Sequence, residues 1–239
     1  MTLLEQYNDK RLFIFAGHYG SGKTETAVNF ALALASRGDK TAIVDFDIVN
    51  PYFRTTDAKD VLEQQGIRVI SSRYANSNVD IPALPAEINT LFEDKTLRSV
   101  FDVGGDDIGA KAVSRYRDDF LADDSIMFFV MNIRRPMTTT VDKAEQVFYE
   151  VQDSARLRFD AIINNTNLLN QTDDSDFEAG LDTVQRFAEK VHLPLAFNTL
   201  MDTTKESVAE RYRKRSAQLG VPVFTLSKHI RMDYHNKTP

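Results

Sequence analysis

The chain has 239 residues, and its 29 Lys and Arg against 35 Asp and Glu give a formal net charge of −6, which does not favour nucleic acid as a partner. A hydrophobic content of 42% argues against disorder, and the absence of Cys excludes disulfides, cysteine-ligated metal centres and thiol nucleophiles. No apolar run approaches the ~20 residues of a membrane helix, and residues 1–10 lack a signal-peptide profile, so we expect a cytoplasmic protein without stable membrane insertion.

Short apolar runs alternate along the chain with stretches of helical period, an order typical of parallel strands covered by helices. The first run, 12–16, leads through a glycine-rich turn into a helix expected over 24–36, which Gly38 is expected to end. The second run, 41–44, ends in acidic residues. Further strands are expected at 67–70, 99–103, 126–131, 159–163 and 195–197, and further helical stripes over 144–151 and 177–191.

Several of these strands are uniformly apolar, as expected for a sheet buried on both faces. Residues 71–85 form the longest irregular stretch and are expected to be a surface loop. Because no linker or internal repeat divides the sequence, we predict one domain over residues 1–239 with an α/β, doubly wound, mostly parallel sheet and helices on both faces.

The clearest motif lies between the first strand and the first helix, and it reads Gly17-His18-Tyr19-Gly20-Ser21-Gly22-Lys23-Thr24. This match to G-x-x-x-x-G-K-[ST], in its strand-to-helix context, predicts a P-loop NTPase fold rather than an accidental glycine-rich turn. Backbone N–H groups and the helix start would hold phosphates. These eight residues and Glu25 are therefore expected to bind the nucleotide, with Lys23 on the β- and γ-phosphates and Thr24 on Mg²⁺.

Acidic residues close two of the expected strands. Asp102 is expected to be an outer ligand of Mg²⁺, and the N–H of Gly104 or Gly105 after it to report whether a γ-phosphate is present. At the end of the second strand, Asp47 is expected to orient the attacking water and contribute to the metal site, with Asp45 supporting that site. The alternative for each acid is the capping of a turn or helix.

Together these segments resemble the MinD/ParA family of deviant P-loop ATPases, the CobQ/CobB/MinD/ParA nucleotide-binding domains. Residues 44–48 are similar to the family's switch I, in which an Asp positions the hydrolytic water, and residues 102–105 to its Walker B and switch II segments. The resemblance implies a Mg²⁺-dependent ATPase that forms an ATP-dependent homodimer and acts on a protein partner. It covers most of the chain as architecture and fades after about Leu200.

One position departs from that family. Where its members usually carry a lysine that contacts the partner's nucleotide across the dimer, this chain has His18, followed by Tyr19 in place of a usual Gly. Histidine, with an ordinary pKa of ~6.5, is mostly neutral at pH 7, although phosphate oxygens would favour its protonation. The alternative is that His18 is an exposed loop residue.

Other branches of the family fit less well. Without Cys the chain can hold neither the cluster of the iron-protein reductases nor the zinc site of the tail-anchored-protein targeting ATPase. Residues 226–239 offer no basic amphipathic helix of the membrane-anchoring type.

An amide at the end of the expected strand 159–163 contacts the purine in the resembled family. Here Asn164 and Asn165 stand at that end, with Asn164 the first candidate, and a turn built on paired Asn is the alternative. Because the next residues do not complete the guanine-specific N-K-x-D, ATP is favoured over GTP. Asn198 and Thr199 are weaker candidates for another wall of the base pocket.

Three further segments carry charged or aromatic residues. Residues 50–54 include Tyr52, Phe53 and Arg54, a composition typical of interface hot spots, and 132–136 place Arg134 and Arg135 at the same rim, where they could grip phosphate or a partner. Core filling and solvated charges are the alternatives. A basic cluster over 211–215 is expected to be a solvated face.

Three functions remain open from the sequence. The first is a cytosolic Mg²⁺-ATPase acting as a nucleotide-gated dimer switch with ATP or ADP bound. The second is an ATP-dependent small-molecule ligase of the dethiobiotin synthetase type, with a substrate carboxylate on Arg54, Arg73 or Arg134. The third is an ATP sensor that does not hydrolyse.

Overall fold

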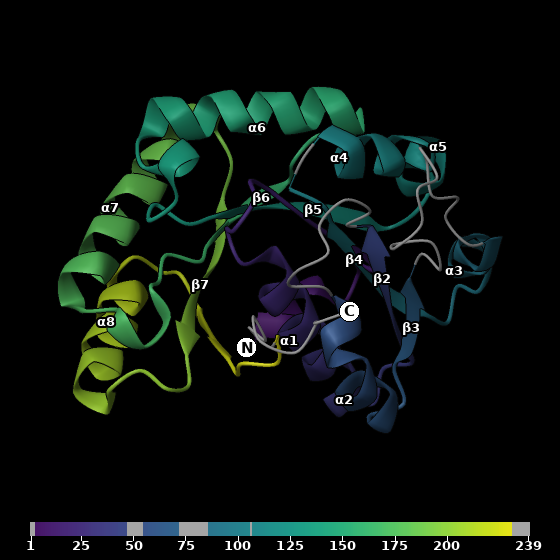
Figure 1. The fold of residues 1–239 in the computed structure, drawn as a ribbon, viewed down its shortest axis with the longest axis horizontal. Coiled ribbons are helices and arrows are strands. Elements are labelled where there is room, and N and C mark those ends of the chain that lie inside the picture. Colours follow the sequence, from purple (N-terminus) through teal and green to yellow (C-terminus); the bar gives the residue numbers. More distant parts are fainter. Residues whose placement is uncertain (1–2, 47–54, 72–85, 106, 231–239) are drawn as a thin grey trace, which may run out of the picture.

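The computed structural model describes residues 3–46, 55–71, 86–105 and 107–230 of the chain (Figure 1). Its strands are β1 (Leu12–Ala16), β2 (Thr41–Phe46), β3 (Arg68–Ser71), β4 (Arg98–Val103), β5 (Ser125–Met131), β6 (Ala161–Asn164), β7 (Leu195–Met201) and β8 (Val223–Leu226). All pair in parallel in one 8-stranded sheet of order β3-β2-β4-β1-β5-β6-β7-β8. β1 therefore lies inside the sheet, between β4 and β5.

The α-helices are α1 (Lys23–Ser36), α2 (Lys59–Gln64), α3 (Asn89–Glu93), α4 (Asp107–Ser114), α5 (Arg117–Leu121), α6 (Val141–Ala155), α7 (Asp174–Val191) and α8 (Glu206–Gln218). Short 3₁₀ turns are η1 (Leu3–Tyr7), η2 (Thr55–Ala58), η3 (Ala86–Ile88), η4 (Pro136–Thr138) and η5 (Leu169–Gln171). In Figure 1, α7 and α8 lie at one end of the molecule, and α3 lies at the other.

Aromatic side chains fill the core on both faces of the sheet. On the face covered by α1 and α2, Phe13 and Phe15 of β1 pack against Phe30 with ring centroids 4.9 and 5.3 Å apart. On the face covered by α4, α6 and α7, Phe129 packs against Phe148 at 5.4 Å. Each such buried ring contributes about 1.5–3 kcal/mol to the free energy of folding. Both faces of the sheet are covered by helices, as the uniformly apolar strands predicted.

Local signals in the sequence fix the length of α1. Gly38 adopts a φ of +93°, and its N–H donates to the carbonyl of Ala35 at 2.9 Å while the N–H of Asp39 donates to Leu34 at 3.2 Å. This hydrogen-bonded end needs a left-handed residue, which glycine supplies at little cost. The expected stop at Gly38 is confirmed.

The expected fold class is confirmed, and every expected strand is present with ends shifted by a few residues. The largest shift is at β7, which continues to Met201 rather than 197. β2 ends at Phe46 rather than 44, and β6 begins at Ala161 rather than 159. β8 was not expected from the sequence. Most of the stretch expected as a surface loop, residues 72–85, lies outside the described part of the chain. Among the described residues, no helix has the length and apolar character needed to cross a bilayer.

Candidate nucleotide-binding site

The phosphate loop, residues 17–24, connects β1 to α1 at the point in the sheet where the connections from neighbouring strands pass to opposite faces. After β1 the chain passes to α1 on one face, whereas after β4 and β5 it passes to α4 and α6 on the other. In open α/β sheets, ligands bind at the carboxyl ends of the strands at such a point. Gly17, Gly20 and Gly22 have φ values of +147°, +74° and +86°, so the loop follows a path that residues with a β-carbon rarely take.

Lys23 and Ser21 give the loop its polar interior. The ammonium of Lys23, whose side chain is largely buried, donates to the carbonyl of His18 at 3.1 Å. The hydroxyl of Ser21 is buried and has no hydrogen-bond partner among the described residues. Since buried polar groups are nearly always hydrogen-bonded, this hydroxyl fits a loop built to receive a polar ligand such as phosphate.

The segment after β4 lies against the phosphate loop. A β-carbon at Gly105 would lie 2.5 Å from the amide nitrogen of Tyr19 and 2.9 Å from the Lys23 ammonium, distances that leave no space for a side chain. Gly104 lies close to α4 instead, since a β-carbon at Gly109 would lie 2.6 Å from the Cα of Gly104. The structure therefore brings Gly105 against the backbone of Tyr19 and the Lys23 ammonium.

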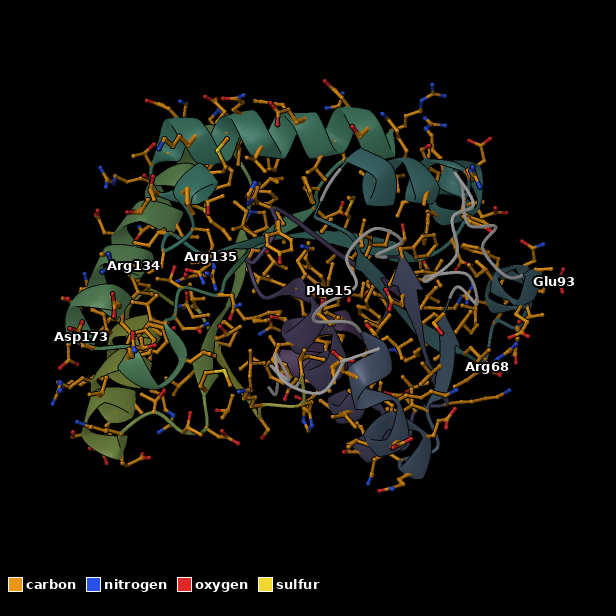
Figure 2. The ribbon with its side chains drawn as sticks, viewed as in Figure 1. Phe15, Arg68, Glu93, Arg134, Arg135 and Asp173 are labelled. Carbon is orange, nitrogen blue, oxygen red and sulfur yellow. The ribbon has the colours of Figure 1, made fainter. Side chains whose placement is uncertain are left out.

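The segment after β5 lies against Gly20, the loop residue next to Tyr19. Its two adjacent arginines, Arg134 and Arg135, make different contacts. Arg134 forms an ion pair with the buried Asp176 at the start of α7. Arg135 instead donates through Nε to the carbonyl of Gly20 at 2.6 Å. In the view of Figure 2, Arg135 lies between Arg134, on the α7 side, and Phe15 of β1.

The segment after β6 contacts the end of the loop nearest α1. Asn165 donates from Nδ2 to the carbonyl of Ser21 at 2.6 Å, and its Oδ1 accepts from Thr199. Asn164 points elsewhere: it is fully buried, and its amide donates to Asn198 at 2.9 Å and accepts from the backbone of Thr166 at 3.1 Å. The structure thus places Asn165, and not Asn164, against the phosphate loop.

Two carboxylates lie side by side next to α1. Asp45 of β2 and Asp102 of β4 are directly paired, Asp102 is also paired with Phe15 of β1, and both aspartates are buried. Directly paired positions of parallel strands share a face, so the carboxylates face the side on which α1 and Thr24 lie. The hydroxyl of Thr55, at the start of η2, donates to Asp102 Oδ2 at 3.0 Å.

Hydroxyl and carboxylate oxygens are the hard ligands that Mg²⁺ prefers, and Mg²⁺ commonly uses only one or two carboxylates beside phosphate and water. Thr24 and Asp102 carry oxygens of this kind, and Asp102 lies on the side of the sheet that α1 covers. No cluster of three or more His, Cys, Asp or Glu side chains suited to a metal occurs in the described ranges.

Glu25, expected to belong to the nucleotide site, uses its side chain elsewhere. Its carboxylate accepts from the backbone N–H of His229 at 2.7 Å and of Ile230 at 3.2 Å. Burial raises the pKa of Glu25, while these hydrogen bonds and Lys228 act against that rise. With Asn29, which exchanges two hydrogen bonds with the backbone of Ser227, Glu25 ties the segment after β8 to the first turns of α1.

The other predicted residues lie around this site or outside the described chain. Tyr19 is 51% exposed, and His18 is half-buried with its Nδ1 3.0 Å from the carbonyl of Tyr19. Asp47, residues 50–54 and Arg73 fall outside the described residues. The basic cluster on α8 is largely balanced by carboxylates, through the ion pairs Arg211–Asp174, Arg213–Glu206 and Arg215–Glu178.

Sequence analysis missed Thr55 and the contact of Glu25 with residues 229–230. A hydroxyl beside a metal-site carboxylate has no sequence signature when 47 residues separate the two, as they do here. The one hint of a role for Thr55 at the site was its position in the sequence directly after residues 47–54.

Comparison with known proteins supports a nucleotide-binding domain. The profile described as the CobQ/CobB/MinD/ParA nucleotide binding domain matches residues 12–225, well beyond Leu200, where the resemblance was expected to fade. Among solved structures, the chain is similar to the signal recognition particle 54 kDa protein from Aeropyrum pernix K1 in complex with GDP, with 17% identity, a TM-score of 0.51, and coverage of 91% of this chain and 50% of that one.

It is also similar to the cell division protein FtsY from Thermotoga maritima, with 18% identity, a TM-score of 0.54, and coverage of 83% and 67% of the two chains. At these identities the likeness shows the fold alone, and this chain spans only half the length of the first of the two. A comparison with curated proteins gave no match.

Proposed function

The chain belongs to the CobQ/CobB/MinD/ParA nucleotide-binding domain family, and from this premise we propose that it is a Mg²⁺-dependent ATPase that works as a nucleotide-gated switch. The observation that carries the proposal is the convergence of three segments on one phosphate loop. Those after β4, β5 and β6 meet it at Tyr19, at Gly20, and at Ser21 with Gly22, in that order. The loss or gain of one bound phosphate would therefore alter the contacts of all three segments with the loop.

The chemistry assigned to each residue follows from its position. Lys23 binds the β- and γ-phosphates, and the N–H groups of the loop and the first turn of α1 bind the remaining phosphate oxygens. Thr24 and Asp102 would hold Mg²⁺, which would neutralise charge on the phosphates when bound. Asp45 supports Asp102 from the neighbouring strand. Asp47, two residues further on, orients the attacking water.

The base is adenine in this proposal. The segment after β6 reads Asn-Asn-Thr-Asn, which lacks the lysine and aspartate of a guanine-specific motif. Asn165 lies beside the phosphate loop, whereas Asn164 would reach a base only if its bond to Asn198 opened. Competition of ATP against GTP for the site tests this assignment, and a preference for GTP would overturn it.

In this proposal the ATP-bound chain forms a dimer with a second copy of itself. The dimer then acts on a further protein. Tyr19, in the phosphate loop, is 51% exposed, and Met137, two residues after Arg135, is 36% exposed. Exposed apolar side chains therefore lie next to the site. Exposed aromatic residues at such a rim are typical of protein contacts. Sedimentation with ATP, ADP or no nucleotide tests whether the dimer requires the triphosphate.

Measurement of ATP turnover distinguishes this switch from a sensor that binds ATP without hydrolysing it. The sensor remains an alternative because His18 replaces the signature lysine. We expect slow phosphate release that Asp47→Ala abolishes while ATP binding persists. Nucleotide binding without phosphate release would favour the sensor. Phosphate release that required an added carboxylate metabolite would favour a ligase.

A further inference from the structure

We propose that Arg135 is the second cation of the phosphate site and that it distinguishes a nucleoside triphosphate from a diphosphate. The inference rests on the proposed nucleotide site and adds a residue role to it. It starts from the hydrogen bond between Arg135 Nε and the carbonyl of Gly20, which joins the segment after β5 to the middle of the phosphate loop.

The backbone that carries Arg135 is held firmly. The carbonyl of Asn132 accepts from the N–H of Arg135 at 3.1 Å and from the buried hydroxyl of Thr138 at 2.6 Å. Two residues before Arg135, the N–H of Ile133 donates to the hydroxyl of Thr166 at 3.3 Å. Arg134 completes the anchoring through its ion pair with Asp176. Arg135 therefore approaches the loop from a fixed base, as a positioning or binding role requires.

The fit between Arg135 and the loop depends on Gly20. A β-carbon there would lie 3.2 Å from Nε, 3.4 Å from Cδ and 3.6 Å from Cζ of Arg135, so the guanidinium and the end of its stem lie directly over the glycine. Only Nε is used in this contact; no described residue bonds either Nη atom. Arginine's planar group can thus bond the loop with one edge and a phosphate with the other.

The location of Arg135 selects the terminal phosphate. Gly105, which approaches the Lys23 ammonium, lies against Tyr19, and Arg135 lies against the adjacent Gly20. Asn165, by contrast, contacts Ser21, nearer the start of α1. Because a P-loop lysine reaches the β- and γ-phosphates, the Tyr19–Gly20 part of the loop is the end at which the γ-phosphate adds its charge.

Charge accounting leaves room for a second cation. A triphosphate carries about four negative charges, of which Mg²⁺ and one ammonium offset about three, and a diphosphate carries about one charge less. His18 stands where a lysine is usual in the family, and an imidazole, unlike an ammonium, does not supply the missing charge permanently. Arg135 supplies it from the same chain at every physiological pH.

Calorimetric titration of the full chain with ATP and with ADP, in Mg²⁺ buffer, tests the inference. We expect Arg135→Gln to weaken ATP binding about 10- to 100-fold, the usual range for a charged hydrogen bond, and ADP binding less than about 3-fold. Arg135→Lys should fall between wild type and Arg135→Gln, because a lysine keeps the charge without the two-edged contact.

One arginine outside the site serves as the control. Arg186→Gln removes the same charge from an exposed i,i+4 pair with Asp182 on α7 and should change neither affinity. Arg134→Gln removes the neighbouring anchor; it should lower the urea midpoint and weaken ATP binding less than Arg135→Gln does. Equal effects of Arg135→Gln on ATP and ADP, or none, would overturn the inference while leaving the nucleotide site intact. Absence of nucleotide binding by the wild-type chain would instead refute the proposed function on which it rests.

Discussion

Asp45 and Asp102 occupy directly paired positions on the neighbouring parallel strands β2 and β4, and both are buried on the side of the sheet that α1 covers. Two carboxylates in such positions disfavour each other's charge, and a bound cation relieves that cost. Thr55 donates to Asp102, so the segment that follows residues 47–54 contacts one member of this pair directly.

This contact predicts a coupling between Thr55 and Mg²⁺. Thr55→Val keeps the shape of the side chain but removes the donor, which should lower the free energy of unfolding by about 1–3 kcal/mol and weaken the Mg²⁺ dependence of nucleotide affinity. Urea denaturation and titration of ATP with and without Mg²⁺ measure the two effects. Thr55→Ser, which keeps the hydroxyl, should retain the Mg²⁺ response; a response in Thr55→Val equal to that of wild type would contradict the coupling.

Gly105→Ala should disable the response to the γ-phosphate. The new β-carbon would lie 2.5 Å from the Tyr19 nitrogen, so the segment must move away from the loop. We expect phosphate release to fall by about 10-fold or more, an effect worth at least about 1.4 kcal/mol in the barrier.

Gly38→Ala is the matched control for that substitution. Its β-carbon would have no neighbour within 4 Å, although φ is +93°, so it costs stability without touching the site. A turnover in Gly105→Ala as high as in Gly38→Ala would show that the close contact has no role.

Asn165 is expected to hold the phosphate loop in its binding conformation. Asn165→Asp has nearly the same shape but cannot donate to the carbonyl of Ser21, and it sets a negative charge against that oxygen. Nucleotide affinity should fall by at least about 10-fold, and stability by about 1–3 kcal/mol. If calorimetry gave unchanged affinity, the loop would not depend on this bond.

Stability in acid should depend on Asp123, far from the site. Burial alone would raise the pKa of Asp123, but hydrogen bonds from Arg11 and Lys95 outweigh it and lower the pKa to about 2. A folded-state pKa below the unfolded value of ~3.9 stabilises the protein above pH ~4, and this stabilisation is lost as the pH falls toward 2. Urea midpoints of wild type and Asp123→Asn should therefore differ most at neutral pH and converge in acid; a constant difference would contradict the assignment.

Much of the fold follows from the sequence because its signals are local. The P-loop motif, the apolar runs and Gly38 each determine structure within a few neighbouring residues. β8 escaped prediction because its short run Val223–Leu226 is partly exposed at the edge of the sheet and carries no distinctive pattern.

The site was less predictable where it depends on side-chain direction. Arg134 and Arg135 look equivalent in the sequence, yet one pairs with Asp176 and the other with the phosphate loop, a division set by the hydrogen bonds of the segment after β5. The same holds for Asn164 and Asn165, because adjacent residues at a strand end point in opposite directions.

Calorimetric titration of the wild-type chain with ATP in Mg²⁺ buffer, beside Lys23→Ala, tests the central claim most directly. The account predicts saturable heat with one nucleotide bound per chain, and affinity reduced by about 10- to 100-fold or more without the ammonium. Identical binding curves for the two proteins, or no heat from the wild-type chain with ATP, ADP or GTP, would contradict it.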